Sequence, residues 1–219
     1  MSKERTQFVC RDCGSVASKW AGQCLDCKAW NSIEEMVVEK TPTRLSGYSG
    51  TAGNEGVQIL SEVRKEELSR FSTGLNELDR VLGGGLVFGS VVLIGGDPGI
   101  GKSTILLQTL IQLSHSGKKV LYVTGEESPS QVALRAERLQ LDGSKLQLLS
   151  ETNVEKILRV AEPMDLDVIV IDSIQTIFTE LLNSAPGNVG QVRESTALLT
   201  RFAKRTGTSI FLAGHVTKE

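Results

Sequence analysis

Residues 91–110 read VVLIGGDPGIGKSTILLQTL, and this stretch decides the fold. It contains the pattern G-x4-G-K-[ST], preceded by an apolar run typical of a buried strand and followed by a helical pattern. In such a loop the glycines let backbone N–H groups turn toward phosphate oxygens, and the helix N-terminus adds a positive field. We expect Lys102 to reach the β and γ phosphates as a catalytic group and the Ser103 hydroxyl to ligate Mg²⁺. The sequence therefore predicts an ATP-binding loop formed by Gly96, Asp97, Pro98, Gly99, Ile100, Gly101, Lys102, Ser103 and Thr104.

On both sides of this loop, strand-like and helical patterns alternate. Helices are expected at 103–116, 130–139, 154–162 and 189–204, and a short one after Ser72-Thr73-Gly74, which can cap it. The strongest strand-like runs are continuously apolar, as in parallel strands buried on both faces. The pattern predicts an α/β fold with a mainly parallel sheet, its strands at 91–95, 120–124, 146–149, 168–172 and 209–213.

Three of the predicted strands end in polar residues that suit nucleotide chemistry. Asp172 closes the run VIVID in the Walker-B pattern and is expected to bind magnesium. Glu126 and Glu127 follow VLYVT, and one of them is expected to orient the attacking water as catalytic base. The alternative for this pair is a capping or solvated role, and the choice between the two glutamates stays open with a slight preference for Glu126. His215 follows the last strand, where it could sense the γ-phosphate or serve only a structural role.

All four cysteines, Cys10, Cys13, Cys24 and Cys27, lie near the N-terminus in the pattern C-x2-C-x10-C-x2-C. Four thiolates brought together in two CxxC pairs suit tetrahedral Zn²⁺. Two disulfides or one redox CxxC are the alternatives, but a reducing compartment disfavours disulfides, and a redox motif needs one pair. Trp20 and Trp30 could be contact residues, although residues of this kind more often form the small core of such a module.

Composition limits the remaining possibilities. The chain has 219 residues, of which 40% are hydrophobic and 23% charged, with a net charge of −2. These values exclude wholesale disorder, and any nucleic-acid affinity must come from local patches. No apolar run approaches the roughly 18–20 residues of a bilayer-spanning helix, and the charged N-terminus has no secretory pattern. We therefore expect a cytoplasmic protein with no membrane partner, divided into a zinc ribbon at 1–31, a flexible linker and lead-in at 32–70, and a core at 71–219.

The sequence also resembles a known family. The stretch RFSTGLNELDRVLGGGL at 70–86, followed by GDPGIGKST, is similar to the opening of RecA-type ATPase cores, including KaiC-like and Rad51-like proteins. With the four-cysteine ribbon, RLSGYSG, VTGEES, VIDSIQT, PGNVGQVRE, LTRFAKRTG and GHVTKE, the chain resembles the bacterial RadA (Sms) family over essentially all of residues 8–219. The resemblance implies a RecA-like P-loop core, and Glu126 and His215 match the family's catalytic-glutamate and γ-phosphate-sensing positions.

The resemblance further implies a helicase-like, DNA-dependent ATPase that processes recombination intermediates and promotes branch migration of RecA-mediated strand exchange. Its expected partners are single-stranded and branched DNA and a RecA-type recombinase filament. The full-length protein is expected to form a homo-hexamer. Residues 183–190 correspond to a DNA-facing loop, and Asn188, Arg193 and Arg201 are the candidate DNA-binding residues. The alternative for the charged residues of this helix is a solvated helix face, which is the expectation for Lys204 and Arg205.

RadA proteins continue beyond the point that corresponds to Glu219, so the core is expected to be truncated at its C-terminus. Two other functions stay open. One is a KaiC-like signalling or protein-remodelling ATPase whose ribbon recruits a protein, and the other is a zinc-binding adaptor without catalysis.

Overall fold

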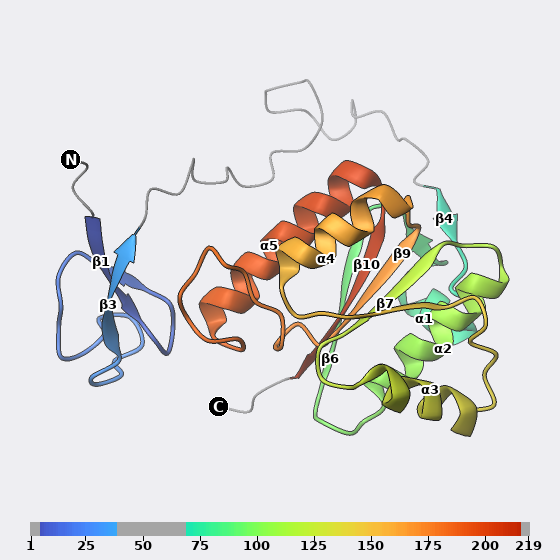
Figure 1. Ribbon diagram of the computed structural model, residues 1–219, viewed down its shortest axis with the longest axis horizontal. Coiled ribbons are helices and arrows are strands. Elements are labelled where there is room, and N and C mark those ends of the chain that lie inside the picture. Colours follow the sequence, from blue (N-terminus) through green and yellow to red (C-terminus); the bar gives the residue numbers. More distant parts are fainter. Residues whose placement is uncertain (1–4, 39–68, 216–219) are drawn as a thin grey trace.

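The computed structural model describes residues 5–38 and 69–215. The first of these segments forms the cysteine-containing ribbon and the second forms the α/β core (Figure 1). Most of the predicted linker, the RLSGYSG stretch and the last four residues of GHVTKE lie outside the described residues.

A five-stranded, all-parallel sheet organises the core. The strand order is β6-β10-β9-β7-β8. The central strand β9 therefore lies between β10 and β7, which come from distant parts of the chain. The strands are β6 (Val91–Gly96), β7 (Val120–Thr124), β8 (Gln147–Ser150), β9 (Val168–Asp172) and β10 (Ser209–His215). The predicted parallel α/β fold is confirmed, and β10 extends two residues beyond the predicted strand to include His215.

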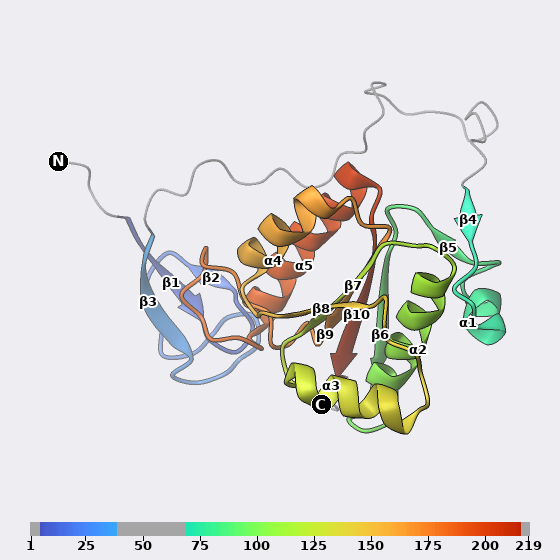
Figure 2. The same cartoon turned by 45° about the vertical axis from the view of Figure 1, so that its right-hand side comes forward.

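Helices cover both faces of the sheet (Figures 1 and 2). α2 (Lys102–His115) and α3 (Pro129–Arg138) pack on one face, and α4 (Val154–Ala161) and α5 (Val189–Thr206) pack on the other. On β9, Val168 and Val170 join the core beneath α2, while Ile169 and Ile171 join the core beneath α4 and α5. Because successive side chains of a strand face opposite sides, this double cover requires the unbroken apolar run seen in the sequence.

The lead-in to the sheet consists of β4 (Arg70–Phe71), α1 (Asn76–Val81) and β5 (Leu86–Val87), with β4 and β5 paired antiparallel. The N-cap of α1 is Leu75, which makes no capping bond with its side chain. Instead, Ser72 and Thr73 donate hydrogen bonds to the Asp79 carboxylate inside the helix. The predicted Ser-Thr cap therefore acts through a helix side chain and not through the backbone of the first turn.

The ribbon is a three-stranded antiparallel sheet in the order β2-β1-β3, formed by β1 (Arg5–Cys10), β2 (Val16–Ala17) and β3 (Ile33–Val38). The structure places β3, which lies in the predicted linker, against β1 along its full length. Trp20 and Trp30 are 59% and 71% exposed, so the expectation that they form the core of this module is wrong. Cys10, Cys24 and Ile33 form that core, since these two of the four cysteines are buried.

Candidate nucleotide site and cysteine cluster

The predicted phosphate loop connects the end of β6 to the start of α2. Gly99 and Gly101 have φ values of 81° and 99°, in the left-handed region that glycine adopts without strain. The Lys102 side chain is buried and lies along this turn, where its Nζ donates to the carbonyl oxygens of Gly96 and Asp97 at 2.9 Å each. Ser103 and Thr104 occupy the first turn of α2, which carries no acidic residue. The positive field of the helix N-terminus is therefore not offset by a carboxylate in its own first turn.

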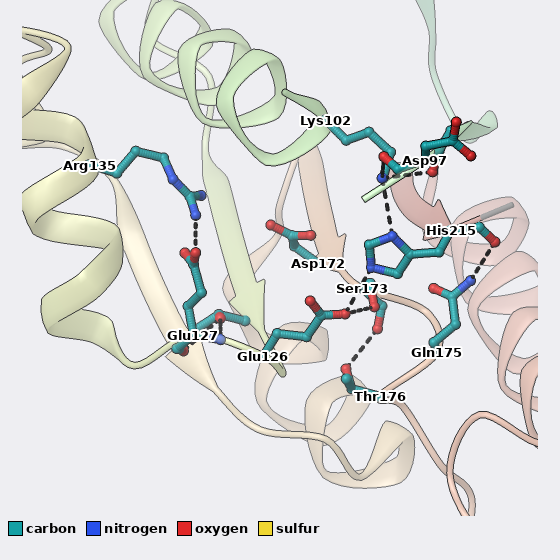
Figure 3. A network of polar contacts seen from close by, with 12 residues as sticks. Asp97, Lys102, Glu126, Glu127, Arg135, Asp172, Ser173, Gln175, Thr176 and His215 are labelled. Atoms are coloured by element: carbon teal, nitrogen blue, oxygen red, sulfur yellow. Dashed lines mark hydrogen bonds and ion pairs between the residues drawn. The ribbon is translucent and has the colours of Figure 1, made fainter. Parts of the chain in front are cut away.

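The parallel sheet brings the remaining candidates to the same edge, because the carboxyl ends of parallel strands lie together. In register, His215 pairs with Gly96, and Thr124 pairs with Asp172. His215 then contacts two other predicted residues, with its Nδ1 3.2 Å from Lys102 Nζ and its Nε2 3.3 Å from Glu126 Oε1 (Figure 3). The fold therefore joins the phosphate-loop lysine, the last strand and the segment after β7 in a chain of polar contacts.

Glu126 has a second partner that sequence reasoning missed. The Ser173 hydroxyl, almost fully buried after β9, donates to Glu126 Oε1, the oxygen that also faces His215. A small hydroxyl residue directly after Asp172 was the available signal. Together Ser173 and His215 hold the Glu126 carboxylate toward the phosphate loop.

Glu127 points elsewhere. Its carboxylate forms an ion pair with Arg135 of α3, and its backbone N–H donates to Thr124 Oγ1 at 3.1 Å. Figure 3 shows the two glutamates diverging, with Glu126 toward His215 and Glu127 toward α3. The side-chain contacts thus distinguish Glu126 from Glu127, which the sequence could not do because the two residues are adjacent.

Asp172 is buried at the end of β9, with 8% of its surface exposed. Its Oδ2 accepts a hydrogen bond from the Tyr122 hydroxyl of β7. Burial, reinforced by the charge of Asp172, raises the pKa of Tyr122, so the phenol stays protonated and donates. A carboxylate and the Ser103 hydroxyl are oxygen ligands of the kind that Mg²⁺ prefers, so the residues present fit this ion.

The four cysteine Sγ atoms form a compact cluster, all within 4.8 Å of one another. The Cys10–Cys27 and Cys13–Cys24 sulfur pairs are each 3.6 Å apart. In a tetrahedral ZnS₄ site with Zn–S bonds of about 2.3 Å, the sulfurs lie roughly 3.8 Å apart, so the cluster fits zinc. The Ser15 hydroxyl lowers the pKa of Cys24 to about 6, which favours the thiolate that a metal requires.

The candidate DNA-binding residues all lie on α5 or at its N-cap, but their side chains have different surroundings. Asn188 caps α5 by accepting from the N–H of Gly190, and its amide donates to the carbonyl of Arg11 in the ribbon. Arg193 is exposed on the first turns of α5. Arg201 lies two turns further along and is 3.5 Å from Glu194, with 27% of its side chain exposed. Arg193 is therefore the one of these three with an open, charged side chain.

These features define the class of protein: a RecA-like P-loop ATPase domain preceded by a zinc ribbon. The chain belongs to the AAA domain family, whose sequence profile it matches over residues 60–219. Residues 8–35 match a second family, the rubredoxin metal binding domain.

The predicted resemblance to RadA is confirmed. The chain is 60% identical over its whole length to DNA repair protein RadA of Pseudomonas aeruginosa and 54% identical, over 97% of its length, to that of Escherichia coli. It spans about half the length of these relatives, 48% and 47% respectively.

A solved KaiC-like protein from Pyrococcus horikoshii shares the fold with a TM-score of 0.59 at 23% identity, covering 69% of this chain and 73% of the other. Among the described residues, no helix has the length and apolar character needed to cross a bilayer.

Proposed function

We propose that this chain carries the nucleotide-hydrolysing half of an ATP-driven DNA motor of recombinational repair. The observation that carries the proposal is the contact chain from Lys102 through His215 to Glu126, which links the phosphate loop to a positioned carboxylate. A carboxylate held within reach of the phosphate loop is what water activation requires.

In this proposal Gly96–Thr104 cradle the triphosphate, and Lys102 leaves the carbonyls of its own loop for phosphate oxygens. Glu126 is the base that orients and deprotonates the attacking water, and His215 responds to the γ-phosphate. Ser103 and Asp172 would hold Mg²⁺, which neutralises charge on the phosphates when bound. We assign Glu127 to the structural pair with Arg135, and not to the reaction.

The DNA role is supported by the relatives, whose names describe DNA repair. We propose that the chain acts, as part of a longer cytoplasmic protein, on single-stranded and branched DNA. In that protein, ATP turnover would be stimulated by DNA and would drive branch migration of joints made by a RecA-type recombinase, from a hexameric ring. Asn188, Arg193 and Arg201 are the proposed contacts, with Arg193 the most accessible to a phosphate backbone. The cysteine cluster would bind one Zn²⁺ per chain.

ATP binding and turnover test the proposal. We expect the wild-type chain to bind ATP, turnover of the longer protein to rise with single-stranded DNA, and DNA binding to weaken steeply with salt. Lys102→Ala should abolish nucleotide binding. Lys119→Ala removes an exposed lysine that pairs with Asp165, and this control variant should bind nucleotide as the wild type does.

Two results would redirect the assignment. Turnover indifferent to DNA, together with capture of a protein partner, would favour a KaiC-like signalling or remodelling ATPase. Unchanged nucleotide handling in Lys102→Ala would leave a zinc-binding adaptor without catalysis.

A further inference from the structure

A tyrosine hydroxyl lies deep in the apolar core beneath α2. It belongs to Tyr122, in the middle of β7, whose side chain is 0% exposed. The ring packs in the same cluster as Leu106, Leu110, Val170 and Phe211. A phenylalanine would fill this space without having to bury a polar atom, and an unpartnered buried hydroxyl is costly. The hydroxyl therefore calls for an explanation beyond packing.

Its partner is a candidate metal ligand. Tyr122 donates to Oδ2 of Asp172, on the adjacent strand β9. The register pairs Thr124 with Asp172 and Tyr122 with Val170. Tyr122 therefore lies two positions before the residue that stands opposite Asp172. Side chains two residues apart share a face of the sheet, and diagonal neighbours on adjacent strands lie about 7–8 Å apart. A tyrosine ring is long enough to span that diagonal and reach the carboxylate from the core side.

The same face of the sheet carries α2, whose first turn contains Ser103. With Oδ2 engaged by Tyr122 from below, the Asp172 side chain is fixed in one orientation at the strand end. Protein groups that bond to a metal ligand in this way orient it and keep its lone pairs directed at the ion.

We propose that Tyr122 is a positioning residue for magnesium binding: its hydroxyl holds the Asp172 carboxylate in the orientation that receives the ion at the phosphate loop. This inference rests on the proposed role of Asp172 as a magnesium ligand.

The test is the magnesium dependence of nucleotide binding, followed with a fluorescent ATP analogue. In Tyr122→Phe, the Mg²⁺ concentration for half-maximal tight binding should rise about 10–100-fold, the usual effect of removing such a supporting contact. Binding measured in EDTA should stay at the wild-type level. Thr109→Val is the matched control, because it also removes a fully buried hydroxyl of the same face, one that donates to the Ile105 carbonyl within α2.

Two companion variants separate the inference from the proposal beneath it. Asp172→Asn alone should shift the magnesium dependence, and adding Tyr122→Phe to it should cause no further shift. If Asp172→Asn shifts the dependence and Tyr122→Phe does not, or if Thr109→Val shifts it equally, Tyr122 has only a packing role. If Asp172→Asn itself has no effect, the magnesium assignment falls and the inference falls with it.

Discussion

Replacing Glu127 and Glu126 in turn by glutamine should have opposite consequences, because only one of the two carboxylates faces the phosphate loop. The Glu127 carboxylate pairs with an Arg135 side chain that is 13% exposed, while Glu127 itself is 33% exposed. Losing one partner of a fully buried pair costs about 3–5 kcal/mol, and an exposed pair contributes roughly 0–1 kcal/mol. The partly exposed Glu127–Arg135 pair falls between these limits, at about 2 kcal/mol.

That loss of stability translates into a measurable shift. For a domain of this size, about 1 kcal/mol changes Tm by roughly 2–4 °C, so Glu127→Gln should lower Tm by about 4–8 °C. Below this transition, ATP turnover should stay within a few-fold of wild type, since the phosphate loop and Glu126 are untouched.

Glu126→Gln should do the reverse. The Glu126 side chain, which contacts His215, is 41% exposed, so the free energy of unfolding should change little. Turnover should fall by about 10²–10⁴-fold, the usual contribution of a general base, while ATP still binds.

Thermal unfolding and single-turnover hydrolysis, measured on both variants in the same buffer, provide the comparison. A Glu127→Gln variant with wild-type Tm and abolished turnover would refute the division of roles drawn from the geometry. So would a Glu126→Gln variant that hydrolyses ATP normally.

Three further predictions concern the ribbon, the lead-in and acid stability. Cys24→Ser should remove zinc from the purified protein and unfold the ribbon, because so small a module depends on its metal; metal analysis and circular dichroism would show this. Gly85→Ala should destabilise the core by about 1–3 kcal/mol, since Gly85 has a φ of 123° and an added Cβ would lie 2.5 Å from a backbone carbonyl oxygen of β4. Gly143→Ala, with open space around it, is the control in the same urea titration. Hydrogen bonds from Ser72 and Thr73 outweigh burial and hold the pKa of Asp79 below its ordinary 3.8. The associated stability is therefore complete above about pH 4 and lost as pH falls through the folded-state pKa, so Asp79→Asn should flatten the acid limb of a stability–pH profile.

The sequence predicted the elements well because each carries its own signal. The run VIVID could be identified as a parallel strand since both of its faces are covered by helices, and Gly99 and Gly101 marked the turn that only glycine adopts easily. The spacing of the four cysteines was sufficient to predict a cluster that fits zinc, because two CxxC pairs are short-range geometry.

The ribbon shows where local signals failed. β3 is itself the short stretch after Asn31 that was expected to begin the linker, yet it pairs with β1 at Arg5–Cys10. The exposure of Trp20 and Trp30 was not evident from the sequence either, because Cys10, Cys24 and Ile33 form the small core of the ribbon in their place.

Sequence alone determined that a phosphate loop, acidic strand ends and a cysteine ribbon exist, because these depend on residues close together in the chain. The tertiary structure decided which side chains meet. Glu126 and Glu127 are adjacent in sequence but point to His215 and Arg135, and Tyr122 reaches Asp172 only because β7 and β9 are neighbours in this register. Strand order and register are set by packing across the whole core, and no local stretch of sequence encodes them.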